Sequence, residues 1–310
     1  MFNYKLELNT KYGIRVRVVE DSVSEAGVRL VTLELRCHRY ILAEINTHRM
    51  MSKSTASSRA IPLAKRIDAV MNDPALPVRW GANQKGMAAG VEMKNRKWLS
   101  WGWRILGRVV AIVARLFWSG LHKQVASRPL EPWLFAETVL SSTEWDNFLS
   151  LRTQGANLDI EDVHERIEEA LDSGRSGVQP EMLVLALLAD EALKASEPVA
   201  VGTGGWHLPY VAAGERGTLA ARDQVARSVA RCARVSYEAH GDSGKTLKDD
   251  QERYHAIVEE RHDSALEHTA MALGDGALWG GNFRGWLQDR QHAHGEPPYN
   301  KVPCARLADR

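Results

Sequence analysis

The densest collection of chemically active side chains in this sequence lies between Glu44 and Arg59. Two arginines, a histidine and, from Ser52 onward, five hydroxyl side chains fall within these sixteen residues. Serine and threonine favour caps and turns, so a helix entering the segment should unwind there and leave backbone N–H groups free. Free N–H groups beside an arginine bind anions. The segment therefore predicts a phosphate-binding site, although a capped surface helix would have the same residue content.

The elements that must position these residues are predicted from periodicity. Residues 28–37 alternate as a half-buried strand does, and 38–51 can follow as a helix on which Glu44 and His48 share a face, with Arg49 beside them. Strand patterns dominate 4–37, and helical patterns follow at 63–71, 93–125, 133–151, 158–172, 179–195, 218–232 and 247–260. We therefore predict the α+β class, with a mixed sheet flanked by a helical region.

Composition and charge restrict the possible partners. The 310 residues are 44% hydrophobic, which is enough for a substantial core, and no loop is long enough to separate independent domains. With 40 basic and 39 acidic residues, the net charge of +1 provides no global field that favours nucleic acid or an anionic membrane. We predict one domain over 1–310 that ends in a polar tail at about 291–310, and no nucleic-acid partner.

The most hydrophobic segment spans 105–118. It carries Arg108 and Arg115 and is too short to cross a bilayer, so we predict a core helix, with peripheral membrane contact as the alternative, and expect no membrane partner. The N-terminus carries charges where a signal peptide needs an apolar core. The three cysteines show neither disulfide nor metal-binding spacing, which favours a cytoplasmic location. No metal site is expected, because the paired histidines at 292 and 294, and at 255 and 262, have no third ligand positioned by spacing.

Five segments of the sequence resemble the flavin-dependent thymidylate synthases. The run from His48 to Arg59 keeps the spacing of that family's signature, which is Arg-His-Arg, two residues, Ser, one residue, Asn-Glu, one residue, Ser-Gly-Arg. Asn147-Phe-Leu-Ser-Leu-Arg152 resembles the family's Asn-Phe-Leu-x-Leu-Arg helix. Upstream, Lys123–Pro132 resembles, with a small shift, the family's segment that holds nucleotide phosphate through an arginine, here Arg128.

The last two of these segments stand out of order. Arg231–Tyr237 and the run from His262 to His268 resemble the family's Ala-Arg-Val-Ser block and its His-x-Ser-x-x-Glu-His element, which in the family precede the arginine-rich helix. Here they follow it by about two hundred residues, and compact folds tolerate such permutation when their termini lie close together. The resemblance thus implies the family's fold with a permuted segment order and a helical insertion at about 153–178.

The resemblance also implies an activity and its residues. It implies transfer of a one-carbon unit from methylenetetrahydrofolate to dUMP, with FAD as cofactor and NADPH as reductant, in a homotetramer whose sites are built from several subunits. Arg152 would be the catalytic residue that stabilises charge on the uracil ring. The implied flavin contacts are His48, Arg49, Asn147, His262 and Ser264. The implied nucleotide contacts are Glu44, Thr55, Ser57, Ser58, Arg59, Arg128 and Arg152.

Four positions depart from the signature, and they leave the reaction open. Thr47 replaces its first Arg, Ser54 the Asn, Thr55 the Glu and Ser58 the Gly. Loss of the Glu removes a ligand contact, which Glu44 could replace from one helical turn before His48. A related pyrimidine-nucleotide enzyme, such as one making 5-hydroxymethyl-dUMP, and a nucleotide-binding homologue without turnover therefore stay as alternative hypotheses.

Overall fold

The computed structural model describes residues 4–57, 59–86, 89–118, 120–174, 176–237 and 244–300. Its strands are β1 (Leu6–Asn9), β2 (Arg15–Ser24), β3 (Arg29–His38), β4 (Ser52–Thr55), β5 (Phe135–Ser142), β6 (Val199–Val201), β7 (Trp206–His207), β8 (Ala270–Ala272), β9 (Leu278–Gly280), β10 (Phe283–Arg284), β11 (Trp286–Gln288) and β12 (Tyr299–Asn300). Its helices are η1 (Arg39–Ile41), α1 (Leu42–Ile45), α2 (Leu63–Asn72), α3 (Arg96–Phe117), α4 (Lys123–Ala126), η2 (Arg128–Trp133), α5 (Asp146–Arg152), α6 (Val163–Ser173), α7 (Pro180–Ala195), α8 (Ala213–Arg216), α9 (Ala221–Val235), α10 (Leu247–Glu259), η3 (Asp263–Ala265) and α11 (Asp289–His294).

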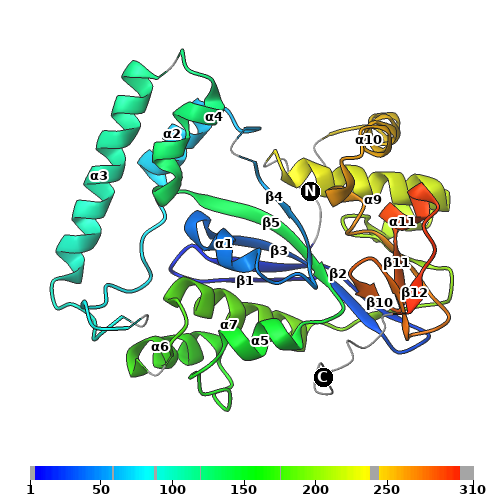
Figure 1. Ribbon diagram of the computed structural model, residues 1–310, viewed down its shortest axis with the longest axis horizontal. Coiled ribbons are helices and arrows are strands. Elements are labelled where there is room, and N and C mark those ends of the chain that lie inside the picture. The colour runs from blue at the N-terminus through cyan, green and yellow to red at the C-terminus, as the bar shows by residue number, and fades with distance from the viewer. Residues whose placement is uncertain are drawn as a thin grey trace, which may run out of the picture.

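A large twisted sheet forms the centre of the molecule (Figure 1). Its strands run in the order β1-β2-β3-β5-β4 with antiparallel pairing, and β6 joins β2 in parallel. Two small sheets, β10-β9-β12 and β11-β8-β7, lie beside it. The sheets are built mainly from antiparallel pairs and helices pack on them, so the predicted α+β class is confirmed. The segment order does not by itself establish a permutation, which stays a prediction.

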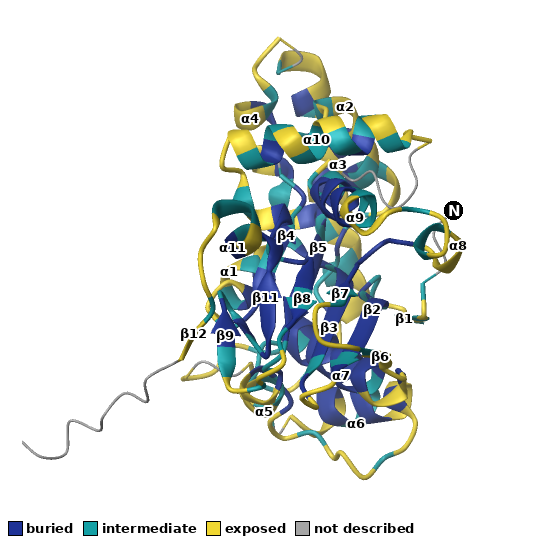
Figure 2. Ribbon diagram, turned by 90° about the vertical axis from the view of Figure 1, so that its right-hand side faces the viewer, coloured by how far each residue is buried: buried dark blue, intermediate teal, exposed yellow. Residues whose placement is uncertain are grey.

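The two faces of the large sheet bury different partners. Val31, Leu33 and Leu35 of β3 pack against α7, which is apolar on almost every side and is therefore a buried helix (Figure 2). Pro180 begins α7 at a position where its missing N–H costs nothing. Val139 of β5 packs on the opposite face with α9, α10 and Leu266. α6 lies in the segment predicted as an insertion and packs on α7.

Several predicted boundaries are wrong. Residues 133–151 are not one helix, because Phe135–Ser142 pairs with β3 on one edge and β4 on the other, and only 146–152 is helical. The helix predicted over 38–51 ends at Ile45, since the Thr47 hydroxyl donates to the Glu44 carbonyl at 2.6 Å. The polar tail forms α11 and β12 up to Asn300, and 301–310 lie outside the described residues.

The helix predicted for the core over 105–118 is also placed differently. It belongs to α3, which stands at the edge of the molecule beside α2 (Figure 1). Only small residues of α3, namely Gly107, Ala111 and Ala114, are fully buried. Trp103 and Val110 are partly buried beside them, while most of the other large apolar side chains of α3 are exposed. The amphipathic period predicted the helix correctly, but not which face the fold would cover.

A chain of hydrogen-bonded side chains crosses the interior between the large sheet and the β11-β8-β7 sheet. We call this the hydroxyl–imidazole chain, and its six members are Ser22, His207, Thr32, Ser141, His268 and Ser54. Its successive contacts are Ser22 Oγ to His207 Nδ1 at 2.8 Å, His207 Nε2 to Thr32 Oγ1 at 2.8 Å, Thr32 Oγ1 to Ser141 Oγ at 2.7 Å, Ser141 Oγ to His268 Nδ1 at 2.8 Å and His268 Nε2 to Ser54 Oγ at 2.9 Å. All six side chains are buried. The hydroxyl–imidazole chain links β2, β3, β4 and β5 to β7 and to the residue two before β8.

Both histidines of this chain are held neutral. Burial lowers the pKa of His268 to about 3, and burial, with smaller effects of Lys5 and His268, lowers the pKa of His207 well below its usual value. Each ring nitrogen contacts a hydroxyl, so the buried polar atoms are satisfied without charge. His207 is thus buried and hydrogen-bonded on both ring nitrogens.

The free energy of unfolding should depend on pH through these two histidines. An unfolded histidine binds a proton below pH about 6.5, whereas folded His268 stays neutral down to pH about 3. The unfolded state therefore gains protons first, and stability should fall by about 1.4 kcal/mol per pH unit per histidine as the pH decreases from about 6.5. Denaturant unfolding between pH 6.5 and 4 measures this slope.

His268→Gln removes one titrating group, so its slope should be smaller than that of the parent by about 1.4 kcal/mol per pH unit. Thr32→Val is the matched control. It breaks the hydroxyl–imidazole chain but keeps both histidines, so it should lower stability and retain the slope. Equal slopes for His268→Gln and the parent would contradict a neutral buried His268.

Candidate functional site

Arg152 joins the two residues that the sequence placed on one helical face. Its Nε donates to His48 Nε2 at 3.2 Å, and its Nη1 lies 3.3 Å from Glu44 Oε2 in an ion pair. Glu44 comes from α1, His48 from the turn after it and Arg152 from the last turn of α5. The ring of Phe148, one helical turn before Arg152, stands edge-on to the His48 imidazole at 5.0 Å between centroids. The fold thus brings together residues about a hundred positions apart.

This arrangement fixes the state of His48. A guanidinium can only donate, so His48 Nε2 must accept and the ring proton must sit on Nδ1. Burial, followed by the charges of Arg152 and Lys53, lowers the pKa of His48. His48 is therefore a neutral imidazole at pH 7. Arg152 Nη2 makes no hydrogen bond or ion pair with the described residues, and the side chain is 21% exposed, so one arm remains open to a ligand.

Lys53 and Glu267 extend the site, and the sequence analysis missed both. Lys53 Nζ donates to the carbonyl oxygens of His48 at 2.6 Å and Ile45 at 3.3 Å, which fixes the turn that carries His48. Burial lowers the pKa of Lys53, and the Glu267 carboxylate opposes this shift. Burial raises the pKa of Glu267, opposed mainly by Arg290, whose Nε lies 3.7 Å away. Glu267 stands inside the His-x-Ser-x-x-Glu-His element, and that motif position was the available signal.

The hydroxyl-rich segment forms a strand instead of an unwound helix end. Ser52–Thr55 is β4, at the edge of the large sheet, paired with β5 so that Ser52 faces Ser141 and Thr55 faces Thr138. The Thr55 and Thr138 hydroxyls lie 3.0 Å apart. Beyond the strand, the Ala56 N–H donates to Glu137 O at 2.8 Å and the Ser57 N–H to Ser236 O at 3.1 Å. The prediction of free backbone N–H groups is therefore wrong at these two residues.

The predicted phosphate contacts lie at the far end of β4 from Arg152. Arg59 and Arg128 are exposed, and Ser57 is half-buried with its hydroxyl accepting from the Arg59 N–H at 3.3 Å. Arg128 begins η2, which follows α4, and the Lys123 ammonium of α4 donates to the Ala60 carbonyl at 3.1 Å. Ser58 lies outside the described residues. One protomer thus places these basic residues at the opposite end of β4 from Arg152.

The predicted flavin contacts divide between two sides of β4. Asn147 lies on α5 beside Phe148, and Arg49 in the turn after His48, and both are exposed. Ser264 lies in η3, which packs on β4, and His262 precedes η3. His262 Nδ1 contacts Glu260 at 3.2 Å with its side chain 70% exposed. His48 is buried, but the other four present their donors to solvent. Within the described residues, no group of three or more His, Cys, Asp or Glu side chains could hold a metal ion.

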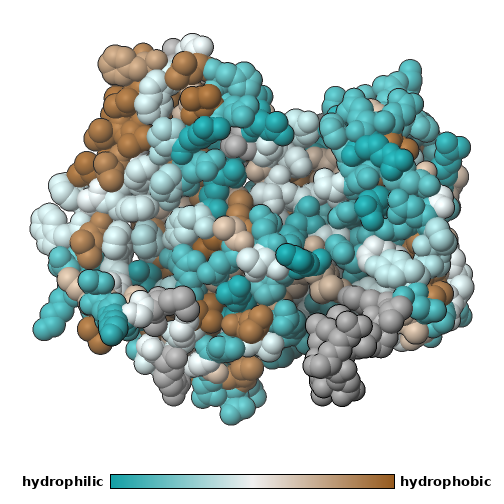
Figure 3. Space-filling model, in the orientation of Figure 1, coloured by the Kyte–Doolittle hydropathy of each residue, from teal (hydrophilic) through white to brown (hydrophobic). Residues whose placement is uncertain are grey.

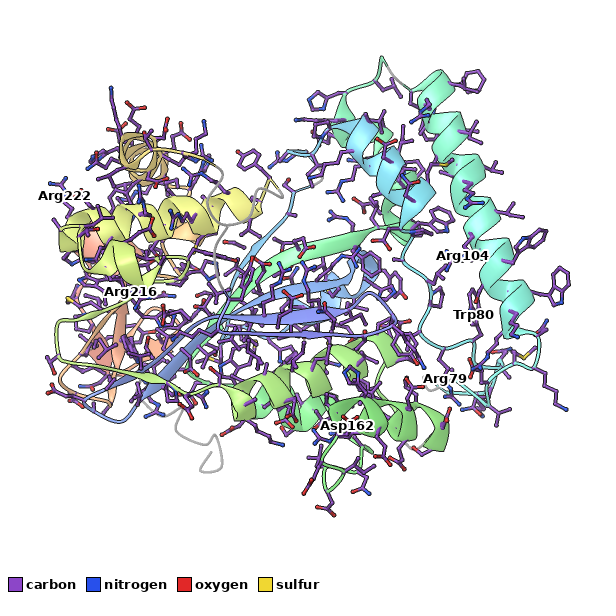
Figure 4. The ribbon with its side chains drawn as sticks, turned by 180° about the vertical axis from the view of Figure 1, so that it is seen from behind. Arg79, Trp80, Arg104, Asp162, Arg216 and Arg222 are labelled. Carbon is purple, nitrogen blue, oxygen red and sulfur yellow. The ribbon has the colours of Figure 1, made fainter. Side chains whose placement is uncertain are left out.

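A separate cleft of about 820 Å³ opens between α3 and the body of the molecule. Arg79 and Trp80, from the loop after α2, and Arg104 of α3 lie along it (Figure 4). None of the predicted site residues lines this cleft. Its Arg96 and Lys11 are already paired with Glu92 and Glu168. The Arg152 cluster, in which burial and the charges of Arg152 and Lys53 lower the pKa of His48, is therefore the candidate site.

This protein was compared with protein families, curated proteins and solved structures. No protein-family model matches the chain, and no curated protein matches it. Among solved structures, the fold is similar to the UMP/dUMP methylase PolB from Streptomyces cacaoi bound with 5-Br dUMP, at 13% identity and a TM-score of 0.43, over 60% of this chain and 92% of that chain. It is also similar to two structures of thymidylate synthase X from Helicobacter pylori with FAD and dUMP, each with a TM-score of 0.28. The first is 16% identical and covers 50% of this chain and 73% of that chain. The second is 20% identical and covers 51% of this chain and 71% of that chain.

Replacement of Arg152 tests the geometry of the cluster. Arg152→Gln removes a cation that holds the pKa of His48 down, so the pKa of His48 should rise toward the usual histidine value, as followed by NMR titration of the imidazole. Arg284→Gln is the matched control, because Arg284 is a half-exposed arginine paired with Glu144 just before α5. A His48 titration that is unchanged in Arg152→Gln would contradict the contact.

Proposed function

We propose that this protein is a flavin-dependent thymidylate synthase that transfers a one-carbon unit from methylenetetrahydrofolate to dUMP. One observation carries the proposal: four of the five segments with family resemblance, which are scattered from residue 48 to residue 268, meet around β4. His48 contacts Arg152 at one end, and Ser54 bonds His268 in the middle. Ser57 bonds Ser236, which follows α9, at the other end. A permuted order would explain why blocks so far apart in sequence share one strand.

The uracil ring would bind at the open arm of Arg152. Glu44 and His48 hold two of its nitrogens, so the guanidinium is oriented before a ligand arrives. Because His48 accepts and carries no charge, it does not compete for the negative charge that develops on an activated uracil oxygen. A charge-assisted contact placed in this way strengthens as the ring becomes anionic, which favours the transition state over the ground state.

The phosphate would bind at the other end of β4. Arg59 offers the planar fork that suits paired phosphate oxygens, and Arg128 would assist from η2. Ser57 and Ser58 would add hydroxyl donors, with Thr55 beside them. Since the Ser57 N–H is occupied by Ser236, the side chains rather than the backbone would bind the phosphate.

The donor set around β4 suits a flavin chemically. Arg49, Asn147 and Ser264 are exposed and, with His48 and His262, they would hold the oxygen-rich edges and phosphates of FAD. When bound, FAD would supply hydride taken from NADPH, and methylenetetrahydrofolate would supply the carbon. The protein contributes orientation, and it holds His48 neutral.

A second outcome, a hydroxymethylated product, is favoured by one feature. Thr55 stands where the signature has its Glu, and it carries a hydroxyl that hydrogen-bonds Thr138 instead of a carboxylate. The carboxylate of Glu44 is paired with Arg152, so it does not replace the missing group as a free carboxylate. A site with one carboxylate fewer could admit water to the one-carbon unit. The product mass decides between them, because hydroxymethyl exceeds methyl by one oxygen.

Sharing of each site between protomers follows from the separation along β4. Arg152 and Arg59 lie near opposite ends of the strand, so the ring and phosphate contacts would come from different subunits. We therefore propose a homotetramer in which one protomer supplies Arg152 and another supplies Arg59.

Arg152→Ala should lower turnover with dUMP, methylenetetrahydrofolate and NADPH by about a hundredfold, because one such charge contact supplies roughly 3 kcal/mol to a transition state. Mass spectrometry of the nucleotide product measures turnover, and Arg284→Gln should retain it. A colourless wild-type protein without dUMP-dependent turnover would exclude the proposal. Flavin binding without any product would favour a binding homologue.

Complementation tests the shared site. Arg152→Ala and Arg59→Ala should each be nearly inactive alone. Co-expression should restore about a quarter of the sites, because half of the subunits supply each intact residue and the pairing is random. Activity of the co-expressed pair no higher than the mean of the two single variants would show that each site lies within one subunit.

A further inference from the structure

α3 presents three different faces. Its inner face carries the small residues Gly107, Ala111 and Ala114, which pack in a cluster with α2 and Trp133. A Cβ at Gly107 would lie 2.8 Å from the Trp133 indole, so the close approach of this face depends on glycine. The helix is therefore held to the body along one narrow side.

The outer face of α3 is an exposed apolar stripe. Its members recur every three or four residues and are Trp98, Trp101, Ile105, Val109, Ile112 and Leu116. Trp98 is 71% exposed and Leu116 is 66% exposed. The stripe runs about 27 Å, at 1.5 Å per helical residue. Hydrophobic side chains gather there on the molecular surface (Figure 3). An exposed apolar patch of this extent marks an interaction surface.

One flank of the same helix is basic. Lys97, Arg104, Arg108 and Arg115 are spaced by seven, four and seven residues and so form a ridge between the stripe and the inner face. Arg115 pairs with Asp68 at 3.0 Å, while the other three make no ion pair with the described residues. From 93 to 130 the sequence holds eight lysines and arginines and no acidic residue, although the whole chain is nearly neutral. Residues 93–130 therefore create a local positive electrostatic potential.

We propose that α3 is an interfacial helix that binds the surface of an anionic lipid bilayer. A helix that combines a Trp-containing apolar face with a basic flank lies in the plane of the interface, with the apolar face about 5–10 Å deep. The ridge would then meet the lipid phosphates. No helix in the described part of the chain is long and apolar enough to span a membrane, so α3 would lie on the bilayer.

Two other binding partners would each match only one of the two features of this surface, the apolar stripe or the basic ridge. In antiparallel self-pairing across the stripe, the basic ridges of both helices would fall on the same side, and α3 has no acidic residue to balance them. Nucleic acid would neutralise the ridge but leave the apolar stripe in water. An anionic bilayer satisfies both the stripe and the ridge. This proposal does not depend on the proposed activity.

The test uses the full chain and vesicles of phosphatidylcholine with or without phosphatidylglycerol. The protein should co-sediment with the anionic vesicles, show blue-shifted tryptophan emission and dissociate as salt is added. Arg104→Gln with Arg108→Gln should weaken partitioning by about thirtyfold, since each basic residue near such a surface contributes roughly fivefold. The same pair changed to Lys should retain binding.

Ile112→Ser with Leu116→Ser should also reduce partitioning, and Leu158→Ser with Val199→Ser, two exposed apolar residues elsewhere, should not. Absence of wild-type binding to anionic vesicles would overturn the proposal. A second result would also overturn it. In this result, light scattering without lipid shows that the wild-type protein is an oligomer and that Ile112→Ser with Leu116→Ser makes it a monomer, while vesicles bind neither the wild type nor the variant. That result would make the stripe an interface between copies of this chain.

Discussion

The hydroxyl–imidazole chain is the constraint on which the rest of this structure depends. Six buried side chains from six separate stretches of sequence can satisfy one another only if β2, β3, β4, β5, β7 and the residue two before β8 take their observed places. An unpaired buried donor or acceptor costs about 1–3 kcal/mol. The proton order is also coupled. If His268 donates from Nε2 to Ser54, then Ser141, Thr32 and His207 must all donate in the same direction, and both imidazoles adopt the same tautomer.

The candidate site is built on the strand that this chain fixes. β4 is an edge strand, and its Ser54 anchors it to His268, whereas Lys53, on the alternate face, reaches the turn that carries His48. Arg152 then closes the cluster from α5. The site thus depends on a neutral interior on one side of β4 and on charged groups on the other, and the alternation of side chains along a strand provides both.

Parts of the fold could be predicted from local pattern alone. Residues 63–72 form a helix whose apolar periodicity, with Pro62 before it, agrees with its one buried face. Residues 180–195 form a helix because Pro180 begins a long apolar run that is buried on almost every side. Phe135–Ser142 was predicted as helix because its apolar content fits both periods, and its strand state comes from pairing on two edges. α3 shows the same limit, since a sequence gives the period of an amphipathic helix but not which side meets the body.

The candidate site was predictable to a similar extent. The spacing of Glu44 and His48 indicated a shared face, and the resemblance added Arg152, which contacts both. Lys53 and Arg290 could not be found in this way, because they come close to the site only when β4 pairs with β5 and packs on η3. Glu267 could have been found from its position in the His-x-Ser-x-x-Glu-His element. The most direct test of the β4 site is amide hydrogen exchange, with and without FAD and dUMP. Ligand protection should appear together in peptides covering 44–57, 146–152 and 262–268. Protection confined to 72–80 and 96–104, along the separate cleft, would contradict the account.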